Sequence, residues 1–235
     1  GSIFSTQHIR RLAKEHDVAL VLESARANGD IVSARKGIAD LELTFTGRAA
    51  HAGVEPEKGR SAILAAAHRV VNLHALNGRW PGVTVNAGVI GGGTRPNVVA
   101  AACRLEVDVR ATSRDTFEQA MAEVDRLVAA PAVEGVSCEL RTTAKHPPME
   151  KTPAAGRLAD LAIAIAADIG FDLHDTATGG ASDGNTTSAA GLPTLDGLGP
   201  IGGDDHSADE WVDLSSVVPR MTLLGALIAR VDEAL

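Results

Sequence analysis

The sequence contains no tyrosine, and its few phenylalanine and tryptophan residues bring the aromatic share to only 3% of 235 residues. A hydrophobic core must therefore be built from alanine, valine, leucine and isoleucine. The hydrophobic share of 45% is that of an ordinary soluble protein, so we do not expect a disordered chain. A chain of this length can bury a core as one large domain or as two smaller ones.

Three further absences narrow the class of protein. No apolar stretch reaches the roughly 18 residues that a membrane-spanning helix needs. The first residues, GSIFSTQHIRR, lack the apolar stretch of a signal peptide. Lysine and arginine (22) are outnumbered by aspartate and glutamate (30), and the net charge of −8 argues against non-specific binding to nucleic acid. We therefore expect neither a membrane nor a nucleic acid as a partner, and the sequence leaves the cellular compartment open.

Cysteine is also scarce, with only Cys103 and Cys138 in the chain. Two cysteines cannot form a disulfide framework or a four-thiolate zinc site. Both lie in apolar runs typical of strands, so we expect buried thiols.

The middle of the chain, about 36–147, carries the clearest secondary-structure pattern. Apolar and polar residues alternate in its predicted strands, and apolar residues recur every three or four positions in its predicted helices. These elements are strands at 39–46, 83–90, 98–111 and 136–143, and helices at 61–76 and 114–130. Thr112 and Asp115 are expected to form the capping box of the second helix. The order β-α-β-β-α-β predicts a split ferredoxin-like domain with four antiparallel strands and both helices on one face.

The flanking segments, 1–35 and 148–235, are typical of an α/β domain. The first holds a helix at 6–16 and an apolar run at 18–22 that suits a strand buried on both faces. The second follows a proline-rich joint and holds a helix at 155–169, glycine-rich loops and a C-terminal helix. We therefore predict an α/β fold: a partial α/β domain with a ferredoxin-like α+β domain inserted at 36–147.

Two positions in the flanking segments are candidate ligands. Glu23 closes the predicted strand 18–22, and ligands of α/β sheets sit outside the carboxyl ends of the strands. It is either a metal- or substrate-binding group or a solvated residue at a strand end. His206 lies in the loop GGDDHSADE, where an imidazole can bind zinc and neighbouring carboxylates can orient it. The alternative is an acidic surface loop with an incidental histidine.

Four more features carry two readings each. The glycine loop TGGASDGN at 178–185 suits an anion or is a tight turn, and it lacks the spacing of a phosphate-binding P-loop. His51 in GRAAHAG follows the first strand of the inserted domain, as a functional group or as plain polar surface. Asn97 follows a run of glycines, and taken alone this pattern is typical of a turn. Arg110 ends a strand, where it clamps a carboxylate or pairs with a neighbouring acid.

Taken together, these pieces resemble the M20 family of metallopeptidases, most closely its glutamate-carboxypeptidase subgroup. Six motifs occur in the family's order along nearly the whole chain. They are VALVLES at Glu23, Lys36-Gly37 with GRAAHAG at His51, the glycine loop to Asn97, Asp108-Val109-Arg110, GGASDGN at 179–185, and PTLDGLGPIGGDDHSADEWV around His206. Each motif alone is weak, but six in register with the same inserted domain make a strong signal.

The resemblance implies a two-zinc exopeptidase or amidohydrolase whose substrate is a small peptide or N-acyl amino acid with a free, glutamate-like carboxylate. It implies that the two zinc ions activate a water molecule and that a glutamate moves the proton. The inserted domain would be the lid and would form a homodimer. The implied roles are zinc ligands for Glu23 and His206, oxyanion stabilisation in the partner subunit's site for His51, and carboxylate binding for Arg110, Asn97 and Gly180.

The chain also departs from the family pattern. The family's first zinc ligands lie in an H-x-D motif, which occurs nowhere in the 235 residues. Its general-base glutamate and bridging carboxylate form an E-E pair just before a G-S dipeptide, and this sequence begins at Gly1-Ser2, which is either native or a cloning scar. We therefore expect an incomplete α/β core with an exposed apolar face, and a chain that alone binds zinc poorly and hydrolyses nothing.

Three hypotheses follow from this departure. In the first, the chain is the C-terminal part of a two-zinc exopeptidase that is active with an N-terminal segment, supplied for instance as a separate chain. In the second, it is a non-catalytic module for dimerisation or ligand binding. In the third, weaker one, it is a fragment with no physiological meaning.

Overall fold

The computed structural model describes residues 4–235, and the chain divides into two compact units. We call Gly1–Lys36 with Pro147–Leu235 the host unit, and Gly37–His146 the inserted unit. Each unit has its own hydrophobic core. The predicted fold class, an α/β unit interrupted by a ferredoxin-like α+β unit, is confirmed.

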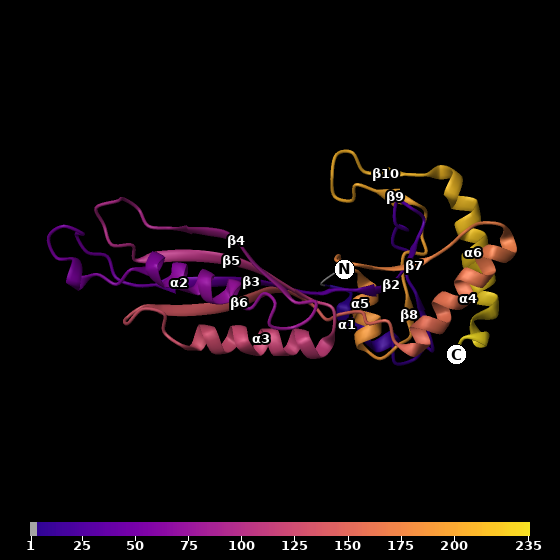
Figure 1. Cartoon of the computed structure of the whole chain (residues 1–235), viewed down its shortest axis with the longest axis horizontal. Coiled ribbons are helices and arrows are strands. Elements are labelled where there is room, and N and C mark those ends of the chain that lie inside the picture. The colour runs from indigo at the N-terminus through magenta and orange to yellow at the C-terminus, as the bar shows by residue number, and fades with distance from the viewer. Residues whose placement is uncertain (1–3) are drawn as a thin grey trace. The chain divides into compact units, whose positions relative to one another are not determined.

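The inserted unit is a four-stranded sheet in the order β4-β5-β3-β6, with antiparallel pairing throughout (Figure 1). Its elements are β3 (Gly37–Thr46), the 3₁₀ turn η1 (Pro56–Lys58), α2 (Ala62–His74), β4 (Thr84–Gly92), β5 (Ala102–Ala111), α3 (Arg114–Ala129) and β6 (Ser137–His146). The predicted capping box of α3 is wrong: the Ser113 hydroxyl, not Thr112, accepts the amide of Thr116. Ser113 stands in the extended conformation that an N-cap residue needs, directly before the first helical residue.

Strict alternation builds the core of the inserted unit. Along β3, Leu41, Leu43 and Phe45 are buried, and the residues between them face the other side of the sheet. Helices α2 and α3 cover the buried face, with Leu73 and Val124 among their buried residues. The side chains between these buried positions are polar, so one face of the sheet is packed and the other meets solvent.

The host unit is made of short strands and longer helices. Its elements are α1 (Thr6–Leu12), β1 (Ala19–Leu20), β2 (Ile31–Arg35), α4 (Pro153–Ile169), β7 (Asp175–Thr178), α5 (Asp183–Ala189), β8 (Thr194–Leu195), β9 (Gly202–Gly203), β10 (Trp211–Val212), η2 (Leu214–Ser216), α6 (Val217–Arg230) and η3 (Val231–Glu233). Strand β1 runs parallel to β8, β2 parallel to β7, and β9 antiparallel to β10. An antiparallel bridge between Val32 and Asp196 joins the β2–β7 pair to the segment that follows β8.

Sequence patterns located the host elements less well. Strand β2 was not predicted, because its five residues follow a turn and show no clear alternation. The predicted strand at 18–22 keeps only Ala19 and Leu20 in its ladder. The first helix ends at Leu12 rather than His16, because the His16 imidazole hydrogen-bonds the Leu12 carbonyl at 2.8 Å and closes the end of the helix.

The C-terminal segment bears on the expectation that the chain has no membrane-spanning helix. Leu214–Glu233 is long and apolar enough to cross a membrane by length and composition alone, although no uninterrupted apolar run is that long. Arg220 interrupts it, and this buried side chain donates to the carbonyls of Gly29, Gly197 and Gly199 in the host unit. A charge satisfied by the loops of one protein unit indicates a helix that packs on that unit rather than a bilayer span.

The outer face of α6 is nevertheless apolar. Val218, Met221 and Ile228 are between 59% and 71% exposed, whereas Leu223 and Leu227 on the inner face are fully buried. The helix therefore carries apolar residues around most of its circumference. A helix of that kind is normally covered on more than one side.

Candidate functional site

Glu23 lies in the loop that follows β1, with an exposed side chain. The loop runs beside the segment after β8, because the Gly199 amide donates to the Glu23 carbonyl at 2.9 Å and the Ala25 amide to Pro200 at 2.9 Å. A Cβ at position 199 would lie 2.8 Å from that Glu23 carbonyl oxygen, so the close approach requires glycine. The structure thus holds the backbone of Glu23 at the carboxyl end of β1 and presents its carboxylate to solvent.

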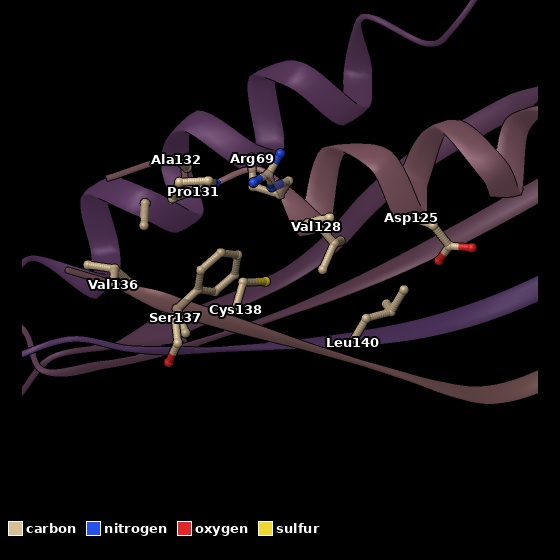
Figure 2. Close-up of a pocket in the computed structure, with 12 residues that line it drawn as sticks. Arg69, Asp125, Val128, Pro131, Ala132, Val136, Ser137, Cys138 and Leu140 are labelled. Carbon is tan, nitrogen blue, oxygen red and sulfur yellow. The ribbon is translucent and has the colours of Figure 1, made fainter. Parts of the chain in front are cut away.

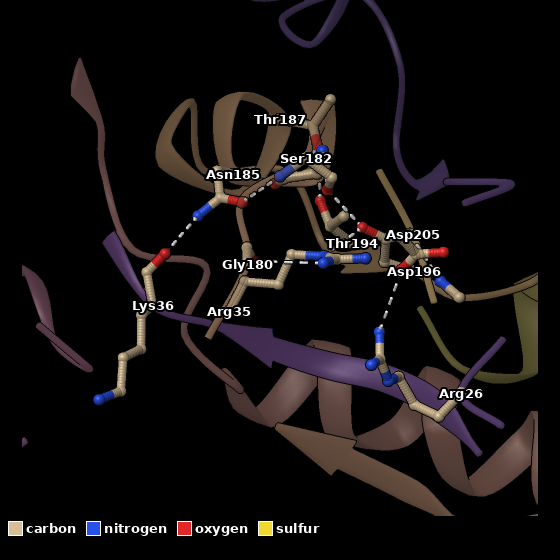
Figure 3. Close-up of polar contacts among 12 residues, drawn as sticks. Arg26, Arg35, Lys36, Gly180, Ser182, Asn185, Thr187, Thr194, Asp196 and Asp205 are labelled. Carbon is tan, nitrogen blue, oxygen red and sulfur yellow. Dashed lines mark hydrogen bonds and ion pairs between the residues drawn. The ribbon is translucent and has the colours of Figure 1, made fainter. Parts of the chain in front are cut away.

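His206 lies in the turn between β9 and β10, also exposed. Its φ of 67° and that of Asp204, 57°, are left-handed, which is uncommon for residues other than glycine. The Trp211 indole donates to Asp204 at 3.1 Å, and Arg26 pairs with Asp205 at 4.0 Å (Figure 3). Arg26 follows Glu23 by three residues, so this contact ties the His206 turn to the loop of Glu23.

These two candidate ligands do not make a zinc centre by themselves. A zinc ion takes about four donors. Among residues 4–235, no group of three or more histidine, cysteine, aspartate or glutamate side chains is arranged to hold a metal ion. Glu23 and His206 are suitable ligand types in neighbouring, exposed loops, and a metal site would need further donors.

The glycine loop around Gly180 is built on a buried carboxylate. The Asp196 side chain is fully buried, and Arg35 Nε donates to its Oδ2 at 2.7 Å (Figure 3). The Ser182 hydroxyl donates to the same oxygen, and the Gly197 amide donates to Oδ1 at 2.6 Å. The Gly180 carbonyl accepts from Arg35 at 3.2 Å. Gly180 itself is exposed, so its loop is a structural turn that leaves this glycine accessible.

Asn185 holds the two chain segments that lead to the inserted unit. Its Nδ2 donates to the Lys36 carbonyl at 3.1 Å and to the Pro147 carbonyl at 2.8 Å. Its Oδ1 accepts the Ser182 amide at 2.9 Å, which completes the capping box of α5. Because α5 uses its first amides in this capping arrangement, the motif GGASDGN serves first as the anchor of the joint.

Sequence reasoning missed the Arg35–Asp196 pair. The signal that was available is an aspartate inside the otherwise apolar run PTLDGLG, since a carboxylate in such a run is seldom left unpaired. The partner could not be read from the sequence, because it lies 161 positions away.

In the inserted unit, the structure brings His51 and Asn97 together. The Ala52 amide donates to the Asn97 carbonyl at 3.0 Å, and His51 forms an antiparallel bridge with Val98. The His51 Nδ1 accepts the Gly53 amide at 3.1 Å, so the neutral ring carries its proton on Nε2. Both side chains are exposed. The pair therefore presents an imidazole N–H and a carboxamide from two adjoining loops.

Arg110 lies near the other end of strand β5. Its Nε donates to both oxygens of Asp108, at 2.9 and 3.1 Å, and this hydrogen bond raises the pKa of Arg110, with the charge of Asp40 adding to it. The side chain is 38% exposed. A substrate carboxylate would share this guanidinium with Asp108.

Within one subunit, Arg110 and the His51–Asn97 pair lie at opposite ends of β5. Arg110 pairs with Ile38 at the start of β3, whereas the loops of His51 and Asn97 follow the opposite end, where Thr46 pairs with Ala102. Eight residues of extended strand span about 27 Å. Within one inserted unit, Arg110 and the His51–Asn97 pair cannot contact the same small substrate.

Comparison with known proteins relates the inserted unit to a known domain family. The family model of the peptidase dimerisation domain of M20 peptidases matches residues 33–136. The chain belongs to the M20 family. The match covers β3 to α3, and with it the loops of His51 and Asn97 and the end of β5 at Arg110.

Relatives extend the M20 assignment to the host unit. The chain is 27% identical to carboxypeptidase G2 from Pseudomonas sp. (strain RS-16) over 231 residues, which are 97% of this chain and 56% of that protein. It is 43% identical over 106 residues, 43% of this chain and 24% of the relative, to the indole-3-acetyl-aspartic acid hydrolase of Enterobacter agglomerans.

A solved structure shows the same fold. The crystal structure of the aminopeptidase PepT from Bacillus cereus superposes with a TM-score of 0.75 at 24% identity, covering 97% of this chain and 62% of that one. The chain thus spans little more than half the length of the M20 proteins that it matches, and it corresponds to their C-terminal portion.

Proposed function

We propose that this chain supplies the lid and the substrate-binding part of an M20 amidohydrolase that removes an acidic amino acid from an N-acyl compound. The observation that carries the proposal is the junction of two separate family motifs, where the Ala52 amide meets the Asn97 carbonyl beside His51. The hydrolase family supports amide hydrolysis. The name of one relative, an indole-3-acetyl-aspartic acid hydrolase, supports an acidic amino acid on the leaving side.

In this proposal each side chain has a definite task. The partly exposed guanidinium of Arg110, which is shared with Asp108, binds the substrate's free carboxylate in bidentate fashion. The His51 Nε2–H donates to the oxygen of the scissile carbonyl as negative charge develops there, which stabilises the transition state more than the ground state. Asn97, from the loop that adjoins His51, and Gly180 hold the substrate's free carboxylate together with Arg110.

For the metal, the proposal names only the ligands that this chain would supply. Glu23 and His206 would each bind one of two zinc ions, and their remaining donors would come from outside these 235 residues. Two protein ligands alone do not hold zinc, which takes about four donors. The expected result for this chain alone is no hydrolysis of an N-acyl glutamate, and such hydrolysis, abolished by a chelator, would contradict the proposal.

The proposed site also requires two subunits. Since about 27 Å of strand separates Arg110 from His51, one substrate can meet both only if they come from different copies. The edge strand β4 supports a dimer, because Val89 and Ile90 are 53% and 52% exposed. Helix α2, which packs over β4, exposes Ile63, Leu64 and Val71. A second copy placed against this edge would extend the sheet and cover those side chains.

The test is a set of variants in the complete, zinc-loaded enzyme that contains this sequence, with N-benzoyl-aspartate as substrate. Arg110→Lys should lower kcat/KM about tenfold or more, because lysine cannot form the bidentate contact. The matched control is Arg104→Lys on the same strand, where Arg104 pairs with Glu42 on the sheet surface, and it should leave kcat/KM unchanged. His51→Ala should lower kcat more than it raises KM.

Mixing the two defective enzymes tests the shared site directly. When dimers of Arg110→Lys and His51→Ala exchange subunits, a mixed dimer has one site with both defects and one site with neither. A two-fold dimer then regains about a quarter of wild-type activity. Loss of activity in both variants without any recovery on mixing would show that the groups act within one subunit, and an unchanged kcat/KM in Arg110→Lys would remove this residue from the site.

The second hypothesis, a non-catalytic dimerisation module, makes a different prediction. It expects the complete protein to dimerise through β4 and to show no chelator-sensitive hydrolysis with any N-acyl amino acid.

A further inference from the structure

The inserted unit contains a cavity on its helical face that the proposed reaction does not use. It has a volume of about 440 Å³ and lies between α2, α3 and β6 (Figure 2). Apolar side chains make up most of its wall, and the polar exceptions are Arg69, Asp125, Ser137 and Cys138. Its volume falls in the range of sites that hold small organic molecules, roughly 300–1,000 Å³.

Arg69 is the unusual member of this wall. The residue is only 2% exposed, and it is the largest fully buried side chain among the described residues. Its Nη2 donates to the Ala130 carbonyl at 2.7 Å, but its Nε–H has no hydrogen-bond partner, and no carboxylate of residues 4–235 lies within ion-pair distance. An unpaired charge and an unbonded donor are both costly in a protein interior.

A capping role explains only part of this arrangement. Ala130 is the C-cap residue of α3, so the Arg69–Ala130 bond satisfies one terminal carbonyl of that helix. That contact uses one of the five N–H donors of the guanidinium. Burial lowers the pKa of Arg69, the Cys138 thiol opposes this effect, and the positive charge of Arg126 adds to it. Because a guanidinium stays charged, its remaining need is an anion.

We propose that this cavity binds a small organic monocarboxylate, with its carboxylate on Arg69 and its apolar body against Phe45, Val128 and Leu140. A wall that combines one cation with several apolar side chains fits this class of ligand. Asp125 lies at the rim, and its carboxylate points away from Arg69 in Figure 2. A second negative charge on the ligand would meet Asp125, so the site selects a single carboxylate.

Binding of benzoate to this chain, measured by calorimetry with benzamide as the uncharged isostere, is the first test. Benzoate should bind with a dissociation constant in the millimolar range, and benzamide at least tenfold more weakly, because only the carboxylate satisfies Arg69. This comparison needs no variant. Equal binding of the two compounds would overturn the proposal. So would the absence of benzoate binding at concentrations up to about 50 mM, well above the expected dissociation constant.

Position-specific evidence comes from Cys138, which lines the cavity with its thiol (Figure 2). Bound benzoate should slow alkylation of Cys138 by iodoacetamide at least threefold, read by mass spectrometry, and leave the buried Cys103 outside the cavity as an internal control. Arg69→Met should abolish both binding and protection. Arg126→Gln removes a nearby exposed charge that pairs with Glu123, and it should preserve both. Protection that persists in a folded Arg69→Met protein would place the carboxylate elsewhere and refute the assignment.

Discussion

The two units of this chain reach their stability by different routes. The inserted unit rests on three strands of ten residues and one of nine, and on an alternating apolar face that two helices cover. The host unit has no strand longer than five residues among those described, and beside its hydrophobic core it holds a buried polar network around Asp196. The individual strands and helices of the inserted unit follow local sequence patterns, whereas the short strands and the polar network of the host unit depend on partners far away along the chain.

The comparison also explains what each unit exposes. In the inserted unit, the exposed apolar residues Val89 and Ile90 lie on one sheet edge. In the host unit, several exposed apolar residues lie along the outer face of α6, where Met221 is 67% exposed. The chain as a whole matches a relative that is almost twice as long, carboxypeptidase G2.

The largest effect is expected from breaking the polar centre of the host unit. Asp196→Ala leaves the Arg35 guanidinium buried without its partner, and should destabilise this unit by about 3 to 5 kcal/mol. Hydrogen exchange followed by mass spectrometry would assign the loss to host peptides. Lys151→Ala removes a partly exposed pair with Asp175 and serves as the control, with an effect of about 1 kcal/mol or less. A similar loss in both variants would contradict the dominance of the Asp196 network.

The second prediction concerns the apolar core of the inserted unit. Leu43 is fully buried, so Leu43→Ala should cost about 3 kcal/mol and increase exchange in the inserted unit alone. Val218→Ala, on the exposed face of α6, should change stability by less than about 0.5 kcal/mol in this chain. Equal exchange in both units after Leu43→Ala would mean that they unfold as one.

The third prediction tests the joint. Asn185→Ala leaves the carbonyls of Lys36 and Pro147 without this donor and removes the capping box of α5, which should cost about 1 to 2 kcal/mol. The increase in exchange should concentrate in peptides around these two positions. Asn72→Ala, on the exposed surface of α2, is the matched control and should show no such increase. A uniform increase across the host unit would show that Asn185 has only a general structural role.

The smallest effect is a pH dependence on the surface of α3. Hydrogen bonds from Arg126 and Arg79 lower the pKa of Glu123 from 4.5 to about 2. Because the folded state holds the lower pKa, this contribution is present above pH 4.5 and is lost as the pH falls toward 2. The difference in urea midpoint between the wild type and Glu123→Gln should shrink over that interval. A constant difference would mean that the Glu123 charge adds nothing.

The two units also differ in how well their helices and strands could be predicted from the sequence. The elements of the inserted unit were predicted within about four residues of their ends, because their amphipathic periods are set by the solvent and by one packed face. In the host unit β2 escaped prediction, and the Glu23 strand proved to be a two-residue ladder. Strand β2 pairs with β7 and bridges to Asp196, and β1 pairs with β8; no local sequence pattern reveals these distant partners.

The candidate site shows the same limit. Motif spacing identified His51, Asn97 and Arg110 as candidates, but it did not reveal that the first two adjoin and the third lies at the far end of β5. Strand pairing supplies that fact. Arg69 gave no sequence signal, because a single arginine in a helix is usually solvated and only the packing shows it to be buried.

The joint between the units has a consequence for how this architecture could arise. Arg35 and Met149 exchange both backbone hydrogen bonds, at 2.9 and 3.0 Å, as do paired residues at the base of a β-hairpin. From the host side, the whole stretch from Gly37 to His146 is therefore a single hairpin loop. A two-residue turn could replace it without moving either end, and a folded domain could be spliced in at the same place for little more than the entropy of closing a loop. The host unit therefore holds the inserted unit at one pair of hydrogen-bonded residues, Arg35 and Met149, and the inserted unit could be lost or gained there as a whole.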